Sequence, residues 1–189
     1  MAKRARIAHA ALELFRIQGY AQTTFDQIAA AARVSRRTVF HHFPTKDAVL
    51  FDHFVVRHEA AVQHLRERPV SESSLVSVHA VLRELAELGY DRRLLTQIRT
   101  ILTAEPLLAL EQFSMGSRVF EQKLVTTLQN RRVTNESTLE ILAVTKMALG
   151  WFTTAAQVYL TEGRPSLVEC FDEVVATCQG APPISIRTA

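Results

Sequence analysis

The sequence predicts an all-α fold of about nine helices. Its 189 residues include only 6 glycines and 6 prolines, while alanine and leucine are abundant. Apolar residues recur at intervals of three and four along most of the chain, and no segment shows the strict alternation of a strand. Because 48% of the residues are hydrophobic, these helices can bury a substantial core.

The first expected helix covers residues 3–18. Its apolar residues lie on one helical face: Ile7, Ala8, Ala11, Leu14 and Phe15. Gly19 follows at the position where a left-handed residue commonly ends a helix. Two more short helices complete a small head. Because three short helices make a small core, we expect the head to lean on the rest of the chain.

Residues 24–46 contain two short helical patterns separated by a break. Thr24 can cap the first helix, and Gln27, three residues later, completes a capping box. Ser35 can cap the second helix, which Pro44 ends because the residue before a proline avoids the helical region. A short apolar helix followed by one rich in hydrogen-bond donors is typical of a helix-turn-helix, whose second helix enters the major groove of DNA.

Residues 7–50 also resemble a known family. The matching positions are Ile7, Gly19, Thr24, Ile28, Ala29, Val34, Ser35, Thr38, Phe40, Phe43, Pro44, Lys46 and Leu50. The run Val-Phe-His-His-Phe-Pro-Thr-Lys at 39–46 is the most specific part. This stretch is similar to the N-terminal domain of the TetR family of bacterial transcriptional regulators. The resemblance implies a homodimer that binds operator DNA through this domain.

The DNA-binding prediction names nine residues in or beside these helices: Thr24, Arg33, Ser35, Arg36, Arg37, Thr38, His41, His42 and Lys46. Arg36 and Arg37 can contact guanine edges or phosphates, although two surface arginines by themselves are more often a solvated basic face. The helix starts at Thr24 and Lys46 suit phosphate oxygens. The resemblance assigns DNA contacts to four of the nine: Thr24, Thr38, His42 and Lys46.

Two positions depart from the family pattern. Where the family usually has a tyrosine whose hydroxyl reaches phosphate, this chain has Phe40, which lacks the hydroxyl. Where the turn between the helices usually has a glycine, this chain has Arg33. We expect Arg33 to be mildly strained if the turn needs a positive φ, and its side chain can add a phosphate contact.

The charge is distributed unevenly along the chain. Residues 1–50 hold 8 Lys and Arg against 3 Asp and Glu, a net charge of +5, whereas the remaining 139 residues hold 14 against 16, a net charge of −2. A basic head on a slightly acidic body fits a protein that meets a polyanion at one end. We therefore predict a helix-turn-helix domain at 1–46, an effector-binding and dimerisation domain at 47–180, and a tail at 181–189.

The C-terminal domain is expected to contain six more helices. They are placed at 45–66, 74–88, 91–104, 106–131, from Asn135 or Glu136 to the break at Gly163, and 166–178. The eighth helix of the chain is apolar on nearly all sides between Ile141 and Leu160. With the ninth helix and their symmetry mates it can form a four-helix dimer interface. The alternative is a central core helix.

Aromatic, methionine and arginine side chains of this domain are candidates for an effector site. The predicted set is Arg99, Phe113, Met115, Arg118, Phe120, Met147, Trp151, Phe152 and Tyr159, with Arg83 and Gln112 as further polar candidates. Most residues of these types are ordinary core. The stretch 99–109, followed by Arg118, is loosely similar to mycofactocin-type TetR regulators, which implies a long-chain acyl-CoA as effector.

Other kinds of site are disfavoured. Five of the seven histidines lie between His41 and His64, but none of the pairs has the spacing of helical metal ligands, so we predict no metal or other cofactor. No nucleophile elbow, glycine-rich phosphate loop or carboxylate pair indicates an enzyme. Cys170 and Cys178 are expected to be buried reduced thiols of a cytoplasmic protein. The sequence contains no uninterrupted apolar run of about 18 residues, so we predict no membrane span.

These observations predict a dimeric repressor that binds a palindromic operator and is released by a small hydrophobic ligand. Two alternatives remain open. One is a DNA-binding activator without a small-molecule effector. The other is a helical lipid-binding protein or enzyme whose basic head only attracts acidic partners. A preference for one operator over random DNA excludes the second alternative, because charge alone binds both DNAs alike.

Overall fold

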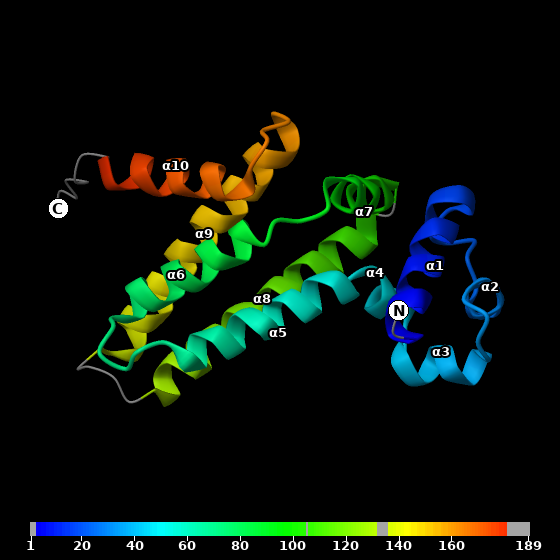
Figure 1. Ribbon diagram of the computed structural model, residues 1–189, viewed down its shortest axis with the longest axis horizontal. Coiled ribbons are helices and arrows are strands. Elements are labelled where there is room, and N and C mark those ends of the chain that lie inside the picture. Colours follow the sequence, from blue (N-terminus) through cyan, green and yellow to red (C-terminus); the bar gives the residue numbers. More distant parts are fainter. Residues whose placement is uncertain (1–2, 105, 132–135, 181–189) are drawn as a thin grey trace. The chain divides into compact units, whose positions relative to one another are not determined.

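The computed structural model describes residues 3–104, 106–131 and 136–180, and of 106–117 only the backbone. The described residues form ten helices and no strand, which confirms the predicted all-α fold. In chain order these are α1 (Lys3–Gln18), α2 (Phe25–Ala31), α3 (Arg36–His42), α4 (Lys46–Leu50), α5 (Asp52–Glu67), α6 (Ser74–Glu87), α7 (Arg92–Ala104), α8 (Pro106–Asn130), α9 (Thr138–Thr161) and α10 (Leu167–Gly180) (Figure 1).

The chain divides into two compact units. Unit 1 consists of Met1–Ala60 and Asp91–Gln122, and unit 2 of Ala61–Tyr90 and Lys123–Ala189. The helices α5 and α8 therefore contribute residues to both units. α4 and α7 belong to the same compact unit as α1, α2 and α3, because both pack against α1. The division of function at residue 46 stays a prediction.

The local signals that predict the helices of the head are present in the structure. α1 ends before Gly19, whose φ of +91° is left-handed. The Thr24 hydroxyl accepts from the Gln27 N–H, and the Gln27 side chain accepts from the Thr24 N–H, which closes the capping box at the start of α2. At the start of α3 the Ser35 hydroxyl accepts from the Thr38 N–H.

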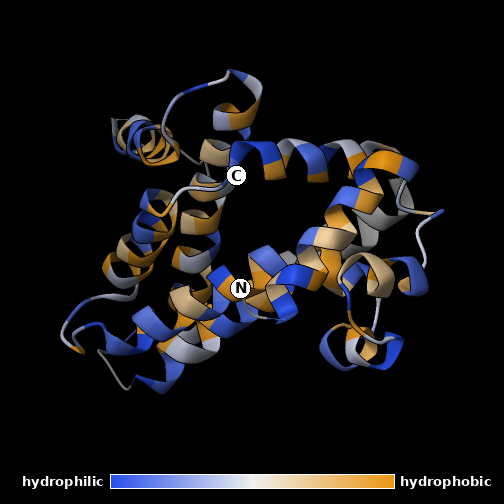
Figure 2. Cartoon of the chain, turned by 45° about the vertical axis from the view of Figure 1, so that its right-hand side comes forward, coloured by the Kyte–Doolittle hydropathy of each residue, from blue (hydrophilic) through white to orange (hydrophobic). Residues whose placement is uncertain are grey.

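One apolar core holds α1 to α4 together with α7. Its buried side chains come from all five helices and from the residue that follows α3: Ile7, Ala11, Phe15, Ile28, Val39, Phe43, Val49, Leu50, Ile98 and Ile101. Because α7 supplies two of these side chains, the small head does lean on the rest of the chain. Figure 2 shows hydrophobic and hydrophilic residues alternating along the helices, as packing on one side requires.

The helix expected at residues 45–66 is two helices. α4 ends at Leu50 and α5 begins at Asp52, because Phe51 between them leaves the helical region with φ −96° and ψ 2°. On one side of this break Leu50 is buried in the core of the head. On the other side the largely buried Asp52 accepts hydrogen bonds of 2.9 and 2.6 Å from the Arg4 guanidinium. The break allows both contacts to form.

Unit 2 is built around α9, which packs against α6 and α10. The predicted start of α9 at Asn135 or Glu136 is wrong for Glu136, because Ser137 caps the helix and forms a capping box with Glu140. Glu136 instead accepts hydrogen bonds from the N–H and the hydroxyl of Ser74. Asn135 lies outside the described residues.

α9 is long and apolar enough, by length and composition alone, to cross a membrane. One of its sides is buried, and the residues on it are Ile141, Thr145, Ala148, Phe152, Ala155 and Tyr159. Another side is exposed and includes Leu139, Ala143, Met147, Gly150 and Thr154. Packing against α6 and α10 accounts for the buried side, so α9 is a core helix of unit 2 with an open side.

The two cysteines differ in their surroundings. Cys170 is buried in α10, and burial raises the pKa of its thiol. Cys178 is exposed, so the prediction of two buried thiols is wrong for this residue. The reason is its position on α10: Val175 is the last buried residue of that helix, and Cys178 lies beyond it.

Candidate nucleic-acid interface

α3 turns one side into the core of the head and leaves the other side open. Val39 and, at the end of the helix, Phe43 are fully buried. Arg36, Arg37 and His41 are exposed. The helix therefore presents two guanidinium groups and an imidazole on its outer side. Such donors fit the phosphates and base edges of a major groove.

The three predicted hydroxyl residues lie at helix starts. Thr24 and Ser35 are the exposed N-cap residues of α2 and α3. The hydroxyl of the half-buried Thr38 lies 2.8 Å from the Ser35 hydroxyl, so the two share one hydrogen bond. These hydroxyls lie at the N-terminal ends of α2 and α3, and a phosphate contact by any of them stays a prediction.

Arg36 is held by an acidic and an aromatic neighbour. Its Nη1 donates to Oδ2 of Asp26 at 3.0 Å, and its guanidinium carbon lies 5.4 Å from the centre of the Phe40 ring. The Phe40 ring packs on Phe25 with 4.4 Å between ring centres. The sequence did not predict a role for Asp26 or Phe25. Their contacts join α2 to α3, and the spacing of residues within a single helix gives no indication of such contacts.

Arg37 and the two histidines of α3 have fewer contacts. Within the part of the chain that the structure describes, the Arg37 side chain makes no hydrogen bond or ion pair. The imidazoles of His41 and His42 lie edge to face with 5.4 Å between their centres. The carbonyl of the half-buried His42 accepts from Arg4 at 3.1 Å. Arg37 and His41 are the side chains most available to a ligand.

Arg33 occupies the turn between α2 and α3. Its φ of +54° is the left-handed conformation expected where the family usually has a glycine. The Arg33 N–H donates to the Ala30 carbonyl at 3.1 Å, and the side chain is exposed. The guanidinium is thus displayed beside α3 on a strained backbone.

Replacing Arg33 by glycine is expected to leave the free energy of unfolding unchanged or to raise it by up to about 1.6 kcal/mol. A left-handed backbone costs a non-glycine residue about 1–2 kcal/mol, and the extra entropy of an unfolded glycine offsets roughly 0.4–1 kcal/mol of that. Urea unfolding measures the difference. Arg33→Ala, which keeps the strain, serves as control and should show no gain. A clear loss in the glycine variant would refute the strain.

Lys46 begins α4 and is tied to the loop that follows α1. Its Nζ donates to the carbonyl oxygens of Tyr20 at 2.8 Å and Ala21 at 3.3 Å, and lies 4.5 Å from the Tyr20 ring centre. The Tyr20 hydroxyl also bonds to Asp47. These contacts anchor the loop to α4. A phosphate contact by Lys46 stays a prediction.

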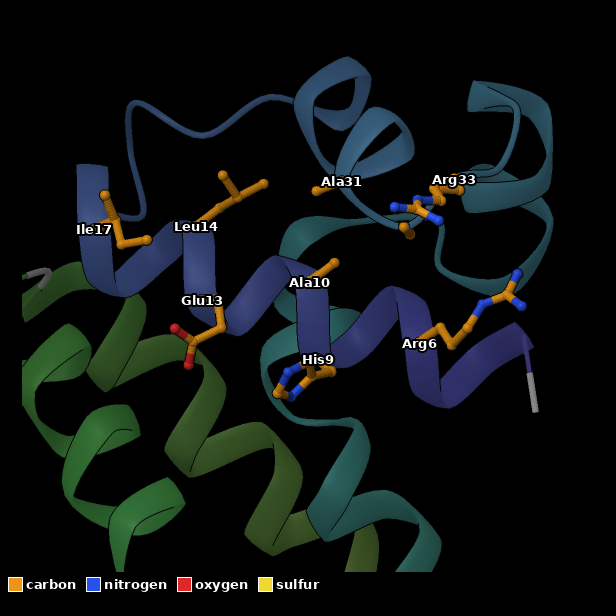
Figure 3. A pocket seen from close by; sticks show the side chains of 9 residues that line it. Arg6, His9, Ala10, Glu13, Leu14, Ile17, Ala31 and Arg33 are labelled. Atoms are coloured by element: carbon orange, nitrogen blue, oxygen red, sulfur yellow. The ribbon is translucent and has the colours of Figure 1, made fainter. Parts of the chain in front are cut away.

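A surface hollow of about 690 Å³ lies beside α1 and the end of α2. Figure 3 shows Ala10 and Leu14 of α1 directed toward Ala31 of α2, with Arg6 and Arg33 at one end. None of the predicted effector residues lines this hollow. Its two guanidinium groups add positive charge beside the turn of the helix-turn-helix.

In unit 1 the three predicted effector residues whose side chains the structure describes differ in their surroundings. Arg99 and Arg118 are exposed. Phe120 is buried and stacked on His58, with 3.9 Å between ring centres. The side chains of three candidates lie outside the described ones: Gln112, Phe113 and Met115. An effector contact by any of these residues stays a prediction.

In unit 2 the predicted effector residues all lie on α9 or α6. Met147 is exposed, Trp151 is half-buried, and Phe152 and Tyr159 are buried. Arg83 on α6 forms ion pairs with two carboxylates of this unit. Because Met147 points away from the side that holds Phe152 and Tyr159, one pocket within this unit would not contact all of them.

The histidines that suggest a metal site do not converge. Among the described residues, no group of three or more His, Cys, Asp or Glu side chains is placed to hold a metal ion. His58 stacks on an aromatic ring, and Nδ1 of His64 lies 3.2 Å from the Glu84 carboxylate. His53 is partly buried, and burial together with the positive charge of Arg57 lowers its pKa.

The head matches a described family and one known regulator. Residues 7–52 match the bacterial regulatory proteins of the tetR family. The HTH-type transcriptional regulator TcmR of Streptomyces glaucescens is 39% identical over 80 residues, which are 42% of this chain and 35% of that protein. The match therefore spans only about a third of the relative's length.

Solved structures share the fold across both units. Thermus thermophilus FadR, a TetR-family transcriptional repressor in complex with lauroyl-CoA, is 24% identical, with a TM-score of 0.54 and 98% of each chain covered. NalD of Pseudomonas aeruginosa, the secondary repressor of the MexAB-OprM multidrug efflux pump, is 20% identical, with a TM-score of 0.58 and 93% of this chain and 92% of that chain covered. At these identities the likeness concerns the fold.

The helix-turn-helix motif, the family match over the head and the shared fold agree with one another. The matching proteins are regulators of transcription and not enzymes. The head of the chain, residues 7–52, is therefore a DNA-binding domain of the tetR family of bacterial regulatory proteins, and the fold of the chain is the one seen in TetR-family regulators.

Proposed function

We propose that this TetR-family regulator is a homodimeric cytoplasmic repressor, which binds a palindromic operator and leaves it when a small hydrophobic molecule occupies the C-terminal domain. The outer side of α3 carries the proposal: Arg36, Arg37 and His41 are exposed there, while Val39 and Phe43 anchor the helix in the core. A helix anchored in this way can enter a major groove while the head stays folded.

Selection of a binding site from random DNA with the full-length protein tests this proposal. We expect enrichment of a palindrome whose half-sites lie about one helical turn apart, or a multiple of it. The selected site should bind at least about a thousandfold more tightly than random DNA at the same salt concentration. Equal affinity for both DNAs would contradict the proposal and favour a helical enzyme or lipid-binding protein with a basic head.

The exposed side of α9 supports the dimer. Leu139 and Met147 on this side are 75% and 42% exposed, which is unusual for large apolar side chains. Small residues lie between and beyond them, at Ala143, Gly150 and Thr154. A second copy of α9 and α10 placed on this side would bury the apolar surface in a four-helix arrangement.

Replacing Gly150 by glutamate is expected to dissociate the dimer while each chain stays folded. A Cβ atom at Gly150 meets no heavy atom within 4 Å in the single chain, so a side chain is accommodated there. Across the proposed interface it would bring a buried, unpaired carboxylate, which costs several kcal/mol. Sedimentation equilibrium measures the mass, and circular dichroism the fold. Gly150→Ala, which adds one methyl group, is the size control. An unchanged dimer in the glutamate variant places the interface elsewhere.

The proposed effector is an acyl-CoA or a hydrophobic molecule of similar size. α5 contributes residues to both units, which supports a role for this helix in passing an effector signal from the C-terminal domain to the head. The Thermus thermophilus regulator of the same fold is complexed with lauroyl-CoA, so long-chain acyl-CoAs are the first candidates. Such a ligand releases DNA by binding more tightly to a state with wrongly spaced heads.

A thermal-shift titration separates this regulator from one without an effector. We expect lauroyl-CoA or a hydrophobic drug to raise the melting temperature and to release the selected operator. Free coenzyme A, which lacks the acyl chain, should do neither. If no molecule of either class changes stability or DNA affinity, the alternative of an activator without effector is favoured. Transcription in vitro from a promoter that overlaps the operator then distinguishes activation from repression.

A further inference from the structure

One ion pair connects α2 with α3 on the outer side of the head, and it involves an arginine of the recognition helix. We propose that Asp26 is a positioning residue that holds Arg36 for the recognition of guanine, while Arg37 is left to neutralise phosphate. The inference rests on the proposed binding of operator DNA. It means that a residue of α2 contributes to the base specificity of the site. It also gives the two adjacent arginines different roles, one in contacting a base and one in contacting phosphate.

The Arg36 guanidinium is restrained from two directions. The Asp26 carboxylate accepts from Nη1 at 3.0 Å, and the guanidinium carbon lies 5.4 Å from the Phe40 ring centre. Phe40 is itself fixed against Phe25, with 4.4 Å between ring centres. Both contacts act on the guanidinium group, one through a hydrogen bond to Nη1 and one through the aromatic ring. Together they reduce the number of rotamers that a free surface arginine would populate.

The pairing leaves donors of Arg36 for a base. The bond to Asp26 uses Nη1, and among the side chains and backbone groups that the structure describes neither Nε nor Nη2 of Arg36 has a hydrogen-bond partner. These two nitrogens lie on one edge of the planar guanidinium, whose parallel N–H groups match O6 and N7 of guanine. Arg37 has no comparable restraint, so it suits a contact with phosphate, which needs charge more than orientation.

The stability of the head does not explain this ion pair. Arg36 and Asp26 have 60% and 65% of their side-chain surface exposed, and pairs so exposed contribute little to folding. A carboxylate on a DNA-binding surface also repels phosphate, so it weakens binding to DNA of any sequence. Asp26 therefore reduces general affinity and, by orienting Arg36, increases the difference between the right and the wrong base.

The test compares Asp26→Ala with Glu13→Ala in the full-length protein. Glu13 forms an exposed ion pair with Arg16 at 2.9 Å on α1, so the control removes the same charge without touching Arg36. Fluorescence anisotropy at one salt concentration gives affinities for the operator selected with the wild type and for random DNA. The guanine that Arg36 contacts is identified first, as the one whose replacement by another base does not weaken binding by the Arg36→Ala variant. A second operator then carries 7-deazaguanine, which lacks the N7 acceptor, at that position.

Asp26→Ala is expected to lower the ratio of operator to random affinity by about tenfold, because an oriented bidentate contact becomes a mobile one. It should also abolish the penalty for 7-deazaguanine, while Glu13→Ala changes neither quantity and Asp26→Glu restores both. A parallel rise in affinity for both DNAs, with an unchanged ratio and an unchanged 7-deazaguanine penalty, would overturn the inference and leave Asp26 as a repulsive charge only. If the wild type selects no operator at all, the proposed function fails instead.

Discussion

Replacing Arg36 and Arg37 together by alanine is expected to weaken operator binding at least about a hundredfold, because a bidentate arginine–guanine pair contributes about 1–3 kcal/mol and each lost phosphate contact adds to this. Both side chains are exposed on the outer side of α3. Their removal should therefore leave the core of the head intact. Anisotropy titrations at several salt concentrations measure both the loss and the change in the salt slope.

An adjacent arginine pair elsewhere in unit 1 provides the control. Arg92 and Arg93 begin α7, and their replacement by alanine removes the same charge from the same unit. We expect this control to weaken operator binding by less than about tenfold, since only long-range attraction is lost. Equal losses in the two double variants would mean that total charge, and not α3, determines the affinity.

Replacing Phe43 by alanine is expected to lower the free energy of unfolding by about 3–5 kcal/mol, the usual cost of truncating a buried phenylalanine. Phe43 is fully buried at the end of α3, and its ring lies 4.4 Å from the Arg4 guanidinium. Because domains are stable by only about 5–15 kcal/mol, this loss removes a large share of the stability of the head. Urea unfolding, followed by circular dichroism, measures it, and operator binding should be lost in parallel.

Phe40 provides a matched control for Phe43. It has the same side chain three residues earlier, but 41% of it is exposed, and its main contact is with Phe25. We expect Phe40→Ala to cost about 1 kcal/mol, which is the order of one aromatic pair at the surface. Similar losses of stability in both variants would show that α3 is not anchored through Phe43.

The parts of the head that could be predicted from the sequence are those set by neighbouring residues. The capping box of Thr24 with Gln27 and the left-handed Gly19 follow from residue type and position, whereas the positive φ of Arg33 is expected only from the glycine that the family usually has there. Helical spacing also separates the buried Val39 from the exposed arginines of α3. These features need no knowledge of the tertiary structure, because the interacting groups lie within one or two helical turns.

What the sequence could not predict depends on contacts between distant segments. The break at Phe51 follows from the core on one side and from Arg4 on the other, and Arg4 is 48 residues from its partner Asp52. The ion pair between Asp26 and Arg36 spans two helices. The effector candidates on α9 were selected by residue type alone, and they lie on opposite sides of the helix. Residue type could not separate them, because aromatic and methionine side chains occur both in cores and at surfaces.

The central claim is that α3 reads the major groove, and methylation interference on the selected operator tests it most directly. Dimethyl sulfate methylates guanine at N7 in the major groove and adenine at N3 in the minor groove. We predict that methylated guanines block binding in two clusters, one per half-site and about 10 base pairs, or a multiple of that, apart. Interference confined to adenine N3, or absent from guanines altogether, would contradict the account.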